Sequence, residues 1–134
     1  MHDILKGMHP LPLDKFKIFF LRHKEIHTVV LFGSHAKRRA RTNSDIDIAL
    51  LLNSNEGVTW DYKSNLSLKL EEMCHQEVDV LILNQASPHI AFRAIKEGKI
   101  IFQRSNRSLW NAFVVKTISM NEDMEILYRK VQHG

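Results

Sequence analysis

Three aspartates and one glycine-serine pair are the residues of this sequence whose types and spacing could do chemistry together. Asp45 and Asp47 are separated by a single residue, and Asp79 lies in the apolar run VDVLIL. Gly33 and Ser34 directly follow the apolar run TVVLF. Carboxylates beside apolar residues are costly unless something neutralises them, and a hard divalent cation does so. The pattern therefore predicts a metal site built on these acids.

The acids Asp45 and Asp47 could reach the same cations, because side chains two residues apart on a strand point to the same face. Their Cα atoms would lie about 6.6 Å apart. In two-metal phosphoryl transfer, ions about 3.5–4 Å apart activate the attacking oxygen and hold the leaving group. Asp79 is the candidate for a third ligand, because an acid in an aliphatic strand needs a special reason.

The pair Gly33-Ser34 could bind the phosphates of a nucleotide. Gly33 has no Cβ, so its backbone can approach a phosphate closely, and Ser34 offers a hydroxyl and an N–H at an expected helix start. Taken alone, the pair is more typical of a plain turn at the end of a strand. Its combination with three acids favours the functional interpretation.

The elements that must position these residues follow from apolar periodicity and turn signals. We expect strands over 28–32, 45–52, 78–83 and 99–103 and helices over 13–24 and 58–74. A further helix begins at Ser87-Pro88 and ends at Gly98, and a long helix begins at 105, with a break near Asn121 as an alternative to one continuous helix. This alternation predicts an α/β (α+β) domain with a mixed sheet and helices packed against it, plus a long C-terminal helix. We expect one domain over 1–104 and a helical segment over 105–134 that packs on it or on a partner.

Residues 33–52, GSHAKRRARTNSDIDIALLL, resemble the signature of the DNA polymerase beta-type nucleotidyltransferase superfamily, in which Gly-Ser precedes Asp-x-Asp by this spacing. The resemblance implies the polymerase beta-like fold, ATP as the nucleoside triphosphate and two Mg²⁺ ions. It implies that the catalytic and metal-binding residues are Asp45, Asp47 and Asp79, with Asp79 also helping to deprotonate the acceptor hydroxyl. The nucleotide-binding residues would be Gly33, Ser34, Lys37, Arg38 and Ser44.

Arg38 is a departure from this superfamily, because many members have glycine two residues after the position of Ala36. The arginine side chain would either contact phosphate or mark a weakened enzyme. The basic run that contains it, Lys37 to Arg41, has a plain alternative as a solvated loop. No aromatic residue interleaves the run, which argues against nucleic acid as the partner.

The chain is too short after residue 103 to build a second domain that would hold an acceptor, so we expect the acceptor to come from a partner. The sequence resembles the minimal nucleotidyltransferase (MNT) antitoxins of HEPN/MNT toxin–antitoxin modules, the MntA-like family. This resemblance implies transfer of AMP to a hydroxyl of a helical HEPN ribonuclease toxin. Two alternatives stay open: an antitoxin that neutralises its partner by binding alone, and a small-molecule nucleotidyltransferase of the aminoglycoside type that acts as a homodimer.

Composition narrows the remaining classes of function. The net charge of +4 suits a polyanionic partner, whether nucleic acid or nucleotide phosphates. No run of about twenty apolar residues and no signal-peptide pattern occurs, so we expect a cytoplasmic protein with no membrane partner. Cys74, the single cysteine, excludes an internal disulfide and is typical of a buried apolar residue. The spacing of His23 and His27 could suit a metal, but a helix end that runs into a strand is the favoured interpretation.

Overall fold

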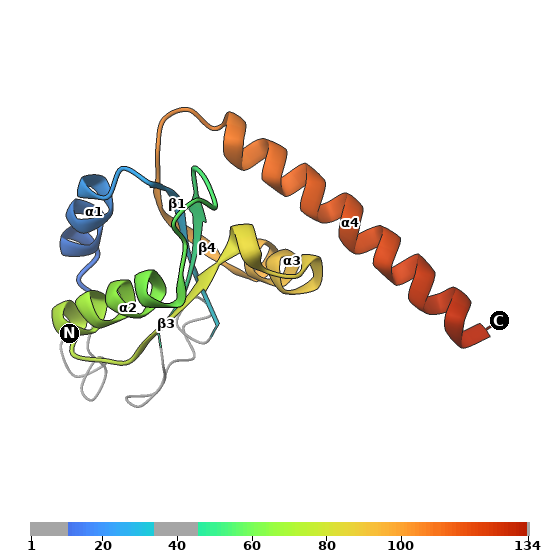
Figure 1. Ribbon diagram of the computed structural model, residues 1–134, viewed down its shortest axis with the longest axis horizontal. Coiled ribbons are helices and arrows are strands. Elements are labelled where there is room, and N and C mark those ends of the chain that lie inside the picture. Colours follow the sequence, from blue (N-terminus) through green and yellow to red (C-terminus); the bar gives the residue numbers. More distant parts are fainter. Residues whose placement is uncertain (1–10, 34–45, 134) are drawn as a thin grey trace, which may run out of the picture.

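A four-stranded mixed sheet carries helices on both faces in the computed structural model, which describes residues 11–33 and 46–133 (Figure 1). The elements in chain order are α1 (Leu13–Arg22), β1 (Ile26–Phe32), β2 (Ile46–Leu52), α2 (Trp60–Cys74), β3 (Val78–Ile82), the 3₁₀ turn η2 (Leu83–Gln85), α3 (Pro88–Glu97), β4 (Lys99–Gln103) and α4 (Ser108–His133). The strand order is β3-β2-β1-β4. Among the described strands, β2 and β3 pair in parallel, and the pairs β1–β2 and β1–β4 are antiparallel. The expected fold class is confirmed.

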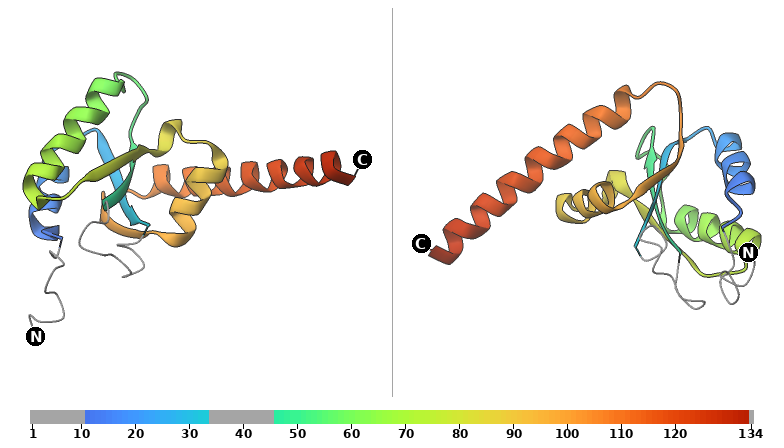
Figure 2. Two further views of the ribbon diagram at one scale, coloured as in Figure 1. Left: turned by 90° about the horizontal axis from the view of Figure 1, so that it is seen from below. Right: turned by 180° about the vertical axis from the view of Figure 1, so that it is seen from behind.

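Two apolar cores lie on the two faces of the sheet. On one face α1 and α2 pack through Phe16, Phe20, Leu66 and Leu70 against alternate residues of the strands, including Ile46, Ile48 and Leu50. On the other face α3 and the start of α4 pack through Ala91, Ala94, Trp110 and Phe113 against Val30, Ala49 and Leu51. Figure 2 shows these layers from two further sides. The alternation along β2 therefore directs Asp47, together with Ala49 and Leu51, to the face that α3 covers.

Most element ends follow the turn signals of the sequence. Ser87 accepts a hydrogen bond from the backbone N–H of Ile90, Pro88 occupies the first turn, and Gly98 ends α3. Thr59 caps α2 in the same way by accepting from the N–H of Tyr62 at 3.1 Å. Both caps match the preference for hydroxyl side chains at helix starts.

The end of α1 differs from the expected helix over 13–24, because it lies at Arg22. The Arg104 guanidinium donates to the backbone oxygens of Phe20, Leu21 and His23 at 3.0–3.2 Å, so a side chain satisfies the last carbonyls of the helix. The chain then enters β1 at Ile26, two residues earlier than expected. His23 and His27 consequently do not share a helical face; His27 is buried in β1 and bonded to the backbone oxygen of Asn106.

The end of β3 also differs by one residue, because the side chain of Asn84 replaces further strand pairing. Its amide accepts from the N–H of Leu52 and donates to the oxygen of Leu52, both at 2.9 Å. At the start of the strand, two side chains of α2 bind the backbone of Val78. Glu71 accepts from the N–H of Val78 at 2.9 Å, and the Ser67 hydroxyl donates to its oxygen.

The helix α4 is continuous, so the possible break near Asn121 is wrong. Residues 108–133 contain neither glycine nor proline, the residues that most often interrupt a helix, and the Asn121 side chain is buried. Figure 1 shows the second half of α4 projecting beyond the sheet. Met124, Leu127, Tyr128 and Val131 are 48–74% exposed along this half. None of the described helices is long and apolar enough to cross a membrane.

Candidate active site

Asp47 and Asp79 are brought together by the pairing of β2 with β3. They are direct partners in the parallel register, and neighbouring strands lie about 4.8 Å apart. Both side chains point to the α3 face, because they share the alternation of Ala49 and Leu81. Asp47 is half-buried and Asp79 is exposed. The two carboxylates therefore form an acid pair at one end of the sheet.

Gly33 lies against the same acid pair from the β1 side. Phe32 is the register partner of Asp47, and Gly33 follows it with a φ of +73°, in the left-handed region that favours glycine. A Cβ at this position would collide with the Oδ2 atom of Asp47. The turn after β1 thus needs glycine for two reasons, its backbone conformation and the space taken by the carboxylate.

The other predicted site residues, Ser34, Lys37, Arg38, Ser44 and Asp45, lie outside the described residues. Their assigned roles stay predictions. Of the eight, the structure places Gly33, Asp47 and Asp79, and it brings these three together.

A cavity of about 340 Å³ opens beside the acid pair. Its lining residues are Phe32, Gly33, Asp47, Lys63, Asp79, Val80, Leu81, Ile90, Arg93 and Glu97. The charged residues Lys63, Arg93 and Glu97 are not among the site residues predicted from the sequence. The spacing of Arg93 and Glu97, four residues apart on α3, indicates a shared helical face. It does not indicate that this face borders the acids, which depends on how α3 crosses the sheet.

The acid pair fits a divalent cation. Two carboxylates in direct register repel each other, and hard oxygen ligands are those that Mg²⁺ prefers. The described residues contain no group of three or more His, Cys, Asp or Glu side chains placed to hold a metal. Asp45, the predicted neighbour of Asp47 in the metal site, lies outside the described residues, so the pair supplies two of the three predicted carboxylates.

Cys74 is unsuited to act as a nucleophile, as its sequence context indicates. The side chain is 5% exposed, and burial raises the pKa of the thiol above its ordinary value. A higher pKa leaves less of the reactive thiolate at neutral pH.

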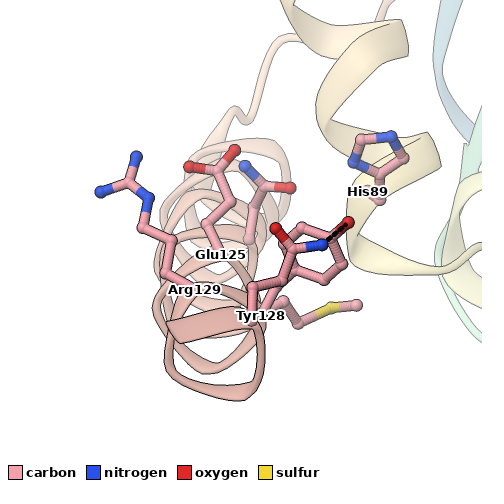
Figure 3. A pocket seen from close by; sticks show the side chains of 7 residues that line it. His89, Glu125, Tyr128 and Arg129 are labelled. Carbon is pink, nitrogen blue, oxygen red and sulfur yellow. Dashed lines mark hydrogen bonds between the residues drawn. The ribbon is translucent and has the colours of Figure 1, made fainter. Parts of the chain in front are cut away.

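A second cavity, of about 560 Å³, lies between α3 and the second half of α4 (Figure 3). Figure 3 shows His89 of α3 on one side and Glu125, Tyr128 and Arg129 of α4 on the other. The Gln132 side chain donates to the Tyr128 hydroxyl at 2.7 Å. Among the described residues, Glu125 is the only carboxylate in its lining, so this part of the chain gives the cavity no paired acids of the kind that phosphoryl transfer needs.

The chain is similar to a known family and to known proteins. A model of the family described as "Polymerase beta, Nucleotidyltransferase" matches residues 14–107, which include the acid pair and Gly33. The chain is 29% identical over 103 residues to "Protein adenylyltransferase MntA" of Shewanella oneidensis. That match covers 75% of this chain and 70% of the relative.

Two solved structures share nearly the whole fold. A crystal structure of a toxin-antitoxin with AMP-PNP matches with a TM-score of 0.78 and 27% identity, covering 92% of this chain and 97% of the other. A structure of the tri-AMPylated Shewanella oneidensis HEPN toxin in complex with MNT antitoxin matches with a TM-score of 0.72 and 26% identity. The second match covers 94% of this chain and 97% of the other.

Proposed function

The chain belongs to the polymerase beta nucleotidyltransferase family, and from this premise we propose that it transfers AMP from ATP to a hydroxyl of a helical HEPN toxin. The observation that carries the proposal is the in-register pair of Asp47 and Asp79 beside Gly33. The similarity to a protein adenylyltransferase and to a toxin-antitoxin with AMP-PNP supports the nucleotide. The similarity to a complex that contains an AMPylated HEPN toxin supports the partner. The chain would thereby act as an antitoxin.

The proposed chemistry assigns a task to each predicted site residue. Asp45, Asp47 and Asp79 would hold two Mg²⁺ ions, which neutralise the charge of the triphosphate and of the attacking oxygen. The turn at Gly33 and Ser34 would bind the triphosphate, with Lys37, Arg38 and Ser44 contributing to its phosphates.

The transfer itself forms a bond from the acceptor oxygen to the α-phosphorus and breaks the bond to pyrophosphate, which leaves. Asp79 would accept the proton of the acceptor hydroxyl, because a base must lie within hydrogen-bond reach of the proton that it takes. Because the cell supplies ATP in the cytoplasm, we expect the reaction to occur there.

The second half of α4 is proposed as the surface that holds the partner. Met124, Leu127, Tyr128 and Val131 recur at helical spacing and form an exposed apolar stripe, which we call the α4 stripe. A helical partner can bury such a stripe against its own helices. Residues 1–104 would then be the nucleotidyltransferase domain, and 105–134 a helical segment that packs partly on this domain and partly on the toxin.

Radiolabel transfer tests the proposed activity. With labelled ATP, Mg²⁺ and the co-purified partner, the native chain should label the partner, and Asp47→Asn should reduce the rate on the order of 10²–10³-fold. Asp61→Asn is the matched control, because Asp61 is an exposed acid of α2 outside the cavity lining. Absence of transfer, or equal rates for Asp47→Asn and the native chain, would contradict the proposal.

Neutralisation by binding alone is the second candidate, favoured by the α4 stripe, which offers an apolar contact surface independent of the acids. A double variant, Asp45→Asn with Asp47→Asn, separates the two functions. If this variant folds and still silences the toxin, binding suffices. If it folds and forms the complex but the toxin stays active, chemistry is required.

A further inference from the structure

Two cations border the cavity of the acid pair from the helices on either side of β3. Lys63 extends from α2 and Arg93 from α3. Within the described ranges, neither side chain forms an ion pair or a hydrogen bond. Lys63 is half-buried and Arg93 is exposed. Both charges are therefore available to a molecule that enters the cavity.

Lys63 lies beside β3, one of the two edge strands of the sheet. It begins a row on α2 with Ser67 and Glu71, spaced four residues apart, and those two side chains bind the backbone of Val78. Lys63 also borders a smaller cavity with Leu81 and Ile82, at the far end of β3. The row therefore runs along the outer side of β3.

The strand order then separates Lys63 from Gly33. Gly33 follows β1, Asp47 lies on β2 and Asp79 on β3, so these three residues succeed one another across the sheet. Lys63 comes after Asp79 in the same direction. The acid pair thus has the turn at Gly33 on one side and Lys63 on the other. Arg93 borders the same cavity from α3, which covers this face of the sheet.

We infer that Lys63 and Arg93 form an acceptor subsite, which binds an anionic group next to the hydroxyl that receives AMP; this inference rests on the proposed function. Phosphoryl transfer places the attacking and leaving oxygens roughly in line. If the triphosphate lies at Gly33, the acceptor approaches the acid pair from the side of β3. Lys63 and Arg93 are the cations that it meets there.

The anionic group has two chemical sources. One is a carboxylate side chain of the partner close to the acceptor hydroxyl. The other is the phosphodiester of an AMP already attached to the partner, since each transfer adds one phosphate and new ribose hydroxyls. Both present oxygens that an arginine fork and a lysine ammonium bind.

Steady-state transfer kinetics test the subsite. Lys63→Met and Arg93→Met should each raise the KM for the partner about ten-fold and leave the KM for ATP unchanged, because each removes a charge-assisted contact with the acceptor alone. Lys63→Arg should restore most of the affinity. The matched controls Lys69→Met on α2 and Lys96→Met on α3 remove exposed charges outside the cavity lining and should change neither KM.

Affinity measurements on two forms of the partner identify the anion. Weaker binding of the unmodified partner by Lys63→Met and Arg93→Met would identify a carboxylate, and weaker binding only of the singly AMPylated partner would identify the phosphate. Unchanged binding of both forms of the partner, or a raised KM for ATP instead of for the partner, would overturn the inference. The proposed function would still stand if the native chain transfers AMP. A native chain that transfers no AMP would overturn both.

Discussion

Gly33 is the residue whose substitution links backbone conformation to the acid pair. Replacing it with alanine imposes a positive φ on a residue with a Cβ, which costs about 1–2 kcal/mol, and drives that Cβ into the Asp47 carboxylate. We expect Gly33→Ala to lower the free energy of unfolding by about this amount. A displaced carboxylate should slow AMP transfer by about 10²-fold. Denaturant titration and the transfer assay measure the two effects.

Gly57 provides the matched control for this substitution. Its φ is +72°, nearly that of Gly33, but a Cβ there meets no atom within 4 Å. Gly57→Ala should therefore lose similar stability and retain full transfer. Equal activity of the two variants would show that the contact with Asp47 is unimportant.

At the residue scale, the sequence predicts the acids and the glycine but not the basic residues of the cavity. Alternation along DIDIALLL places Asp47 on one face, and an acid in VDVLIL is conspicuous because it interrupts aliphatic residues. Lys63 is different, because a lysine in a helix is typical of a solvated surface. Its place beside the acids depends on tertiary packing, which no local pattern records.

At the scale of elements, a hydrogen bond joins α2 to the loop before β1. The Tyr62 hydroxyl donates to Glu25 Oε2 at 2.7 Å. Burial, this bond and the charge of Glu25 raise the pKa of Tyr62 above its ordinary value of 10.0. The folded chain keeps the Tyr62 hydroxyl proton at a pH where the unfolded chain loses it. The contribution of Tyr62 to the free energy of unfolding is therefore complete below pH 10 and is lost progressively above it.

We therefore expect Tyr62→Phe to lower the free energy of unfolding by about 1 kcal/mol at pH 8. The difference from the native chain should shrink as the pH rises above 10, because only the native chain loses this bond. Urea titrations from pH 8 to 11 measure it, with Tyr128→Phe on the exposed part of α4 as the control. A constant difference across this range would refute the explanation.

Arg104 joins α1 to the strands at the end of the sheet opposite the acid pair. Its guanidinium donates to Ile26 and to three carbonyls at the end of α1. Lysine cannot reproduce this fork of donors, so Arg104→Lys should lower the free energy of unfolding by about 2 kcal/mol. Transfer at a temperature where both proteins are folded should be unchanged. Arg107→Lys, an exposed neighbour, should alter neither quantity.

The elements themselves are largely predictable from the sequence, and their ends are less so. Ser87-Pro88 and Gly98 bound α3 as expected, because caps act through nearby backbone. The ends of α1 and β3 depend on Arg104 and Asn84, whose partners lie far away in the sequence. Asn121 suggested a break in α4, yet its side chain is buried in a continuous helix.

At the scale of the whole molecule, the two halves of α4 should contribute differently. Residues 122–132 are exposed throughout, so their removal with the residues that follow should change the free energy of unfolding little. It should weaken binding to the toxin at least about ten-fold, because the α4 stripe is lost. Unfolding curves and titration calorimetry measure the two effects.

A finer variant keeps the helix intact. Leu127→Ser with Val131→Ser removes part of the α4 stripe, and Glu122→Ser with Asp123→Ser changes exposed polar residues of the same helix as a control. Only the first pair should weaken the complex. Toxin binding that survives both the deletion and the first pair would place the contact elsewhere on the chain.

The mixed sheet is predictable from the alternation of helices and strands, whereas the strand order is not. The pairing of Asp47 with Asp79 requires β2 and β3 to be parallel neighbours in one register. A strand–helix–strand connection of this kind favours such neighbours, but the sequence does not specify which side of β2 receives β3. The sequence therefore predicts Asp47 and Asp79 as site residues, but their pairing is visible only in the fold.

The hydrogen bonds from Ser67 and Glu71 to Val78 have a consequence for solubility. An outermost strand with vacant N–H and C=O groups is a template on which another chain can add and start aggregation. The α2 side chains occupy those groups at the start of β3. At the opposite border, β4 is only five residues long and begins with an exposed lysine, Lys99. Both borders of the sheet are thus poor sites for intermolecular strand addition, which lowers the tendency of the folded chain to aggregate.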